Sequence, residues 1–114
     1  MTLTAQVLEY ISEFYGAKPE YLWESSENAA LRNSRNKKWF AVLLTKLPLK
    51  KLGVESDEIS DVINLKCDPL MSFSFVDGKG IFRGYHMNKE HWISVLLNGT
   101  VFLEDIKTLV DLSF

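Results

Sequence analysis

Basic residues gather in one part of this chain, and the chemistry they favour is contact with phosphate. Between residues 28 and 54 every charged side chain is a lysine or an arginine. Four of them lie in or directly beside a polar turn cluster at residues 33–37, so a hairpin would carry these cations at its tip, where they can reach phosphate oxygens. Those four are Arg32, Arg35, Lys37 and Lys38, and Lys66, Lys79, Arg83 and Lys89 would extend the surface if their segments folded beside this hairpin. The sequence therefore predicts eight candidate contacts to DNA.

A second interpretation of the same cations stays open. The formal net charge is −2, and no helix suited to reading bases is recognisable. Lysines on an edge strand also prevent strands of different molecules from pairing. A solvated positive edge without any DNA partner is the alternative to a phosphate-binding surface, and Lys46, Lys50 and Lys51 are expected only to solubilise a loop.

His86 and His91 are the residues that metal or nucleophilic chemistry would use. On a continuous strand their odd spacing would point them to opposite faces, so joint metal ligation requires the chain to bend. Cys67 and Asp68 could complete a four-ligand zinc set, or Cys67 could act as a nucleophile with a histidine as its base. We instead expect Cys67 to be a buried side chain whose thiol pKa is raised by desolvation. No catalytic residue, metal or cofactor is predicted.

An apolar recognition patch is the third possibility. Tyr85-His86-Met87, with Trp92 nearby, could bind another protein, which would make the chain an adaptor domain without catalytic activity. The candidate partners are thus DNA and another protein, and the sequence does not indicate an oligomeric state.

Helices are expected at the two ends of the chain. Apolar residues at helical spacing predict a first helix over residues 4–15, with Thr2 or Thr4 as its cap and Gly16 at its end. Asp68 followed by Pro69 predicts a short helix through about Phe75. A terminal helix begins after Thr100, which we expect to cap it, with its apolar face formed by Leu103, Ile106, Leu109 and Val110.

The strands lie between these helices. Extended segments are expected at residues 21–24, 29–32, 39–44, 63–67 and 91–97, with turns at 33–37 and 77–80 and a loop at 84–89. The alternation of Ile63, Leu65 and Cys67 with polar residues places the apolar set on one sheet face. The order of elements predicts an α+β fold with helices on one antiparallel sheet.

Composition bounds the protein class. Residues 1–114 are expected to form a single domain, since 46% hydrophobic and 25% charged residues are usual for globular proteins. The longest apolar run, at residues 39–44, is too short to cross a membrane. The first residues show neither a signal nor a transit peptide, and Cys67 is the single cysteine, so we expect a cytoplasmic protein.

Two segments resemble the signature stretches of the MmcQ/YjbR family. They are Asn64-Leu65-Lys66-Cys67-Asp68-Pro69 and Gly84-Tyr85-His86-Met87-Asn88-Lys89-Glu90-His91-Trp92-Ile93. With the Pro19/Trp23 region and Lys38-Trp39-Phe40, the similarity covers essentially the whole chain. The resemblance implies a fold like that of CyaY and frataxin, with the N- and C-terminal helices packed on one face of an antiparallel sheet. It also implies that protruding hairpins form a double-wing surface for DNA.

Overall fold

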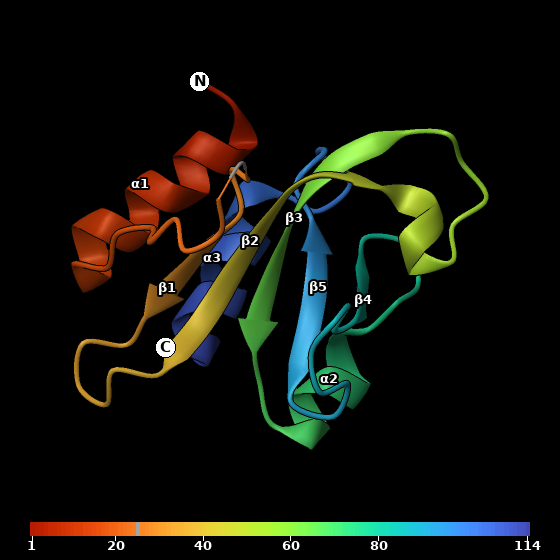
Figure 1. Ribbon diagram of the computed structural model, residues 1–114. Coiled ribbons are helices and arrows are strands. Elements are labelled where there is room, and N and C mark those ends of the chain that lie inside the picture. The colour runs from red at the N-terminus through yellow and green to blue at the C-terminus, as the bar shows by residue number, and fades with distance from the viewer. Residues whose placement is uncertain (25) are drawn as a thin grey trace.

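The computed structural model describes residues 1–24 and 26–114, which form a sheet of five strands with helices at both ends of the chain (Figure 1). The elements are α1 (Leu3–Tyr15), β1 (Ala29–Arg32), β2 (Trp39–Pro48), the 3₁₀ turn η1 (Leu49–Leu52), β3 (Ile59–Lys66), α2 (Pro69–Phe75), β4 (Ile81–Arg83), β5 (Trp92–Leu96) and α3 (Leu103–Ser113). Within the described residues, no helix is both long enough and apolar enough to cross a lipid bilayer.

The sheet has the strand order β1-β2-β3-β5-β4, and every neighbouring pair is antiparallel. The two terminal helices contact each other and share one face of it, where Val7 and Ile11 of α1 join Ile106 and Val110 of α3 in the core. Figure 1 shows α3 passing behind the strands. The α+β class and the placement of both terminal helices on one face are confirmed.

The helix ends follow from local chemistry. Thr2 caps α1 by accepting a hydrogen bond from the Ala5 N–H, and Gly16 ends the helix with a left-handed φ of 66°. Asp68 caps α2 through the Met71 N–H, with Pro69 in the first turn. These three predictions from the sequence are confirmed.

The second sheet face carries a smaller apolar cluster. Leu49 of η1 covers Val62, Phe82 and Leu96, and the half-buried leucines 44, 47 and 52 surround them. The chain after β2 therefore folds back over the sheet instead of running free as a solvated loop. This segment brings Lys51 to the edge strand β4.

Several boundaries differ from the sequence prediction. Residues 21–24 form no strand, and only Glu20 makes a single bridge to Ala30. Residues 81–83, which gave no strand signal, form β4 because Ile81 and Phe82 find a partner in β5. Thr100 does not cap α3: the cap position is Phe102, which supplies no side-chain hydrogen bond.

Candidate functional site

The hairpin at residues 33–38 is a fixed turn that holds its cations in solvent. The Asn33 N–H donates to the Lys38 carbonyl, and the Lys37 N–H donates to the Asn33 carbonyl, each at 2.8 Å. The Asn33 Oδ1 accepts from the Arg35 N–H, while its Nδ2 donates to the Phe114 carbonyl at 2.7 Å. Because these bonds use backbone and asparagine groups, the side chains of Arg35, Lys37 and Lys38 stay exposed.

Arg32 differs from its three neighbours. Its Nε lies 3.0 Å from the Glu20 carboxylate, and its Nη1 donates to the Lys37 carbonyl at 2.9 Å. The guanidinium also lies 5.9 Å from the centre of the Trp39 ring. A local carboxylate thus already pairs the charge of Arg32, and its contact with phosphate stays a prediction that we leave out of the proposal below.

The second wing is the loop between β4 and β5, and a buried polar network anchors it. Asn64 and Ser94 face each other across β3 and β5, and the Ser94 Oγ donates to the Asn64 Oδ1 at 2.5 Å. The Asn64 Nδ2 donates to the Tyr85 carbonyl at 2.9 Å, and the Tyr85 N–H donates to the Ser94 Oγ at 2.8 Å. Both signature stretches thus meet at the backbone of Tyr85.

Gly84 and Lys89 close this loop. A Cβ on Gly84 would lie 2.6 Å from the Trp92 Cβ, so only glycine permits the close approach that lets its N–H bond the Trp92 carbonyl. The Lys89 Nζ donates to the Gly84 carbonyl at 3.1 Å, and His86 adopts a positive φ of 61°. Asn88 holds the end of the loop by accepting the Glu90 N–H.

The predicted apolar recognition patch loses one member. Trp92 is buried, so it cannot belong to that patch.

Three cations converge where this loop meets η1. The hollow, which we call the basic groove, has a volume of about 350 Å³ and is lined by Lys51, Leu52, Val76, Phe82, Arg83, Tyr85 and Lys89. Its cations come from three separate segments, and within the described part of the chain no acidic side chain lines it. Sequence reasoning assigned Lys51 only to a solvated loop. Lys51 reaches the groove because η1 packs on the sheet through apolar contacts. The spacing of charges in the sequence does not reveal those contacts.

The eight predicted cations do not form one surface. Arg83 and Lys89 meet in the basic groove at the β4 edge, whereas Arg35, Lys37 and Lys38 lie between β1 and β2 at the other edge (Figure 1). Lys66 is exposed where β3 ends, between these two clusters. Lys79 precedes β4 and lies at the opposite end of the sheet from the hairpin, apart from both clusters, and its contact with phosphate stays a prediction.

Cys67 is a buried thiol. Its pKa is raised first by desolvation and then by the charge of Asp68. Its N–H donates to the His91 carbonyl at 2.8 Å, a backbone contact that leaves the imidazole exposed. Among the described residues, no three histidine, cysteine, aspartate or glutamate side chains are grouped as metal ligands. A raised thiol pKa disfavours the thiolate that nucleophilic chemistry needs.

Comparisons with known proteins point to one family. The YjbR family model matches residues 12–114. The uncharacterized protein YyaQ of Bacillus subtilis is 40% identical over 115 residues, covering 100% of this chain and 97% of YyaQ. A Pseudomonas syringae protein with a crystal structure is 41% identical, with a TM-score of 0.88 over 96% of this chain and 94% of its own. DR2400 of Deinococcus radiodurans, with a DUF419 domain, shares the fold at 21% identity, with a TM-score of 0.71 over 99% of this chain and 76% of its own.

Proposed function

The chain belongs to the YjbR family, and from that premise we propose that it is a DNA-binding module whose main contact is the basic groove. The observation that carries the proposal is the convergence of Lys51, Arg83 and Lys89 from three segments of the chain. The hairpin with Arg35, Lys37 and Lys38 is the second contact, and Lys66 lies between them.

Electrostatics supports a phosphate ligand at the groove. Three like charges around one hollow repel one another unless an anion or counterions occupy the space between them. Binding a DNA phosphate there releases those counterions, which is the principal source of sequence-independent affinity. The anchored Tyr85 backbone and the Lys89 contact to Gly84 hold the groove in shape without help from the ligand.

The type of contact predicts the type of DNA recognition. The groove and the hairpin present lysine and arginine side chains on a sheet edge and a turn, not on a helix that could enter the major groove. Contacts of this kind position a protein on the phosphate backbone and read little sequence. We therefore propose that the module binds DNA with low sequence preference and catalyses no reaction.

We also propose a cytoplasmic location. The single cysteine, Cys67, is a buried free thiol, which suits a reducing compartment.

Salt-dependent titration of a fluorescent duplex by the parent protein tests the proposal. The logarithm of the affinity should fall with the logarithm of salt concentration with a slope of roughly −3 to −5, from four or five neutralised phosphates. Changing Lys51, Arg83 and Lys89 together to Gln should weaken binding and make that slope smaller by about 2 to 3.

The matched control removes the same charge elsewhere. Lys46, Lys79 and Lys107 lie outside the groove and the hairpin, so their triple Gln variant should keep the slope of the parent. A flat titration of the parent at low salt, or equal losses in the groove variant and the control, contradicts the proposal.

A further inference from the structure

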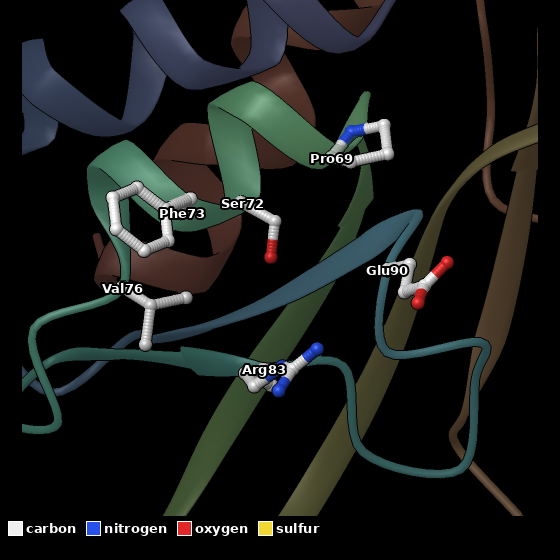
Figure 2. Close-up of a pocket in the computed structure, with 6 residues that line it drawn as sticks. All are labelled: Pro69, Ser72, Phe73, Val76, Arg83 and Glu90. Atoms are coloured by element: carbon white, nitrogen blue, oxygen red, sulfur yellow. The ribbon is translucent and has the colours of Figure 1, made fainter.

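A second hollow lies on the other side of Arg83, between α2 and the edge strand β4. This α2 cleft has a volume of about 500 Å³, within the usual range for small-molecule sites. Figure 2 shows its lining residues, which are Pro69, Ser72, Phe73, Val76, Arg83 and Glu90. They come from one face of α2 and the residue after it, from the end of β4, and from the loop that follows.

Ser72 is the polar group that lies deepest in the cleft. It is only 5% exposed, yet its hydroxyl forms no hydrogen bond with any described residue. Helical hydroxyls elsewhere in the chain do so: the Ser113 Oγ donates to the Leu109 carbonyl at 2.8 Å. Among the described residues, no fully buried polar side-chain atom lacks a partner, so the Ser72 Oγ must open into the cleft. Figure 2 shows it pointing away from the helix toward Arg83.

Two residues of opposite charge line the same cleft. Arg83 and Glu90 both line the cleft, and neither forms an ion pair with a described residue, including each other. On the far side of Ser72 the lining is apolar, formed by Phe73 and Val76 (Figure 2). Phe73 is 88% exposed, so its ring is accessible to a ligand at the edge of the cleft.

We propose that the α2 cleft binds a free apolar α-amino acid. The Arg83 guanidinium takes the ligand carboxylate, with a further hydrogen bond from the Ser72 hydroxyl, and the Glu90 carboxylate takes the ammonium group. The apolar side chain of the ligand lies on Phe73 and Val76. A phosphate or a second anion would be repelled by Glu90, and a simple amine would be repelled by Arg83. A ligand that carries both charges on one head group complements both residues.

This site does not depend on DNA binding. Ser72, Phe73 and Glu90 do not line the basic groove, and Lys51 and Lys89 do not line the α2 cleft. Arg83 and Val76 border both hollows, so only variants of Glu90 and Ser72 test the α2 cleft without altering the basic groove.

Titration of the ¹⁵N-labelled protein with L-phenylalanine, followed by NMR chemical shifts and calorimetry, tests the proposal. Saturable shifts in α2, β4 and the loop after β4 are expected, with a Kd on the order of 1 mM for a ligand of about a dozen non-hydrogen atoms. N-acetyl-L-phenylalanine lacks the ammonium and L-phenylalaninamide lacks the carboxylate. Each should bind the parent at least about tenfold more weakly, the effect of losing one charged hydrogen-bonded contact.

Each charge-removing variant should abolish one of these preferences. In Glu90→Gln the acetylated and free amino acids should bind alike, and in Arg83→Gln the amide and the free amino acid should bind alike. Ser72→Ala should weaken L-phenylalanine, and Lys79→Gln should leave every affinity unchanged. Dispersed NMR spectra establish that each variant folds. Shifts that do not saturate, shifts outside the cleft, or affinities unaffected by Glu90→Gln and Arg83→Gln overturn the proposal.

Discussion

Asn64 and Ser94 are polar residues in the interior of the sheet, and the residues that surround them there are apolar. Asn64 is 1% exposed and Ser94 is fully buried, so water cannot replace any hydrogen bond that they lose. The side chains of both residues form hydrogen bonds with the backbone of Tyr85, in the loop after β4. The network therefore fixes where the loop after β4 leaves the sheet, and with it the position of Lys89.

Replacing Asn64 with leucine should destabilise the protein by about 2–4 kcal/mol. The substitution leaves the Tyr85 carbonyl and one hydrogen-bonding site of Ser94 unpaired in a buried place, and each unsatisfied group costs roughly 1–3 kcal/mol. Urea unfolding followed by tryptophan fluorescence measures the change. Asn36→Leu is the matched control, because Asn36 makes its one side-chain hydrogen bond at an exposed turn.

The double variant Asn64→Leu/Ser94→Ala checks the mechanism. Its loss of stability should be smaller than the sum of the two single losses, since the two side chains share partners. Additive losses, or an Asn64→Leu variant within about 1 kcal/mol of the parent, would refute the network's role.

The two terminal helices are joined by one carboxylate. Asp111 of α3 accepts hydrogen bonds from both Tyr10 and Tyr15 of α1, at 2.6 and 2.5 Å. The hydrogen bond to Asp111 raises the pKa of Tyr10 to about 12, and burial followed by the same carboxylate raises that of Tyr15 to about 12. Lys107 and Glu104 also face Tyr10. The helix pair is thus held by groups that act as donors only while they are protonated.

Raising the pH should weaken this helix pair. Both tyrosines have a folded pKa above the unfolded value of 10, so their contribution to stability is complete below pH 10 and is lost between pH 10 and 12. Asp111→Asn should lower both midpoints toward 10, because it removes the negative charge that opposes tyrosinate formation. Tyrosinate absorbance gives the midpoints, and urea unfolding at pH 9 and pH 11 gives the stability.

Asp105→Asn is the control for that experiment. It neutralises an exposed carboxylate on the same helix that bonds neither tyrosine. If Asp105→Asn lowers the midpoints as much as Asp111→Asn does, general helix charge and not the specific contact sets the pKa values.

The limits of sequence reasoning are clearest at the level of elements. The caps Thr2 and Asp68 and the periodicity of β3 act over a few neighbouring residues, so the sequence predicts them correctly. β4 has only three residues and exists because β5 offers it an edge, a tertiary contact without a local signal. For the same reason the candidate site was predicted in part: Arg83 and Lys89 were identified, whereas Lys51 reaches them through the packing of η1 on Phe82 and Leu96.

At the scale of the whole molecule, the proposed DNA contacts form two clusters instead of one face. The hairpin lies between β1 and β2, and the basic groove lies at β4, three to four strands away. At the usual strand spacing this separation is about 14–19 Å. It is of the same order as the roughly 12 Å width of the major groove of B-DNA, so one duplex can offer phosphates to both clusters.

Simultaneous contact makes a quantitative prediction for combined variants. If one duplex touches both clusters, the Gln variants of Arg35/Lys37/Lys38 and of Lys51/Arg83/Lys89 should each reduce the salt slope, and the variant that combines them should lose about the sum of both reductions. If the clusters instead bind DNA separately, each triple variant keeps the affinity of the remaining cluster, and binding collapses only when both are changed. Titrations of all three variants at several salt concentrations distinguish these cases, and near-parental slopes in both triple variants would exclude a duplex that bridges the two edges of the sheet.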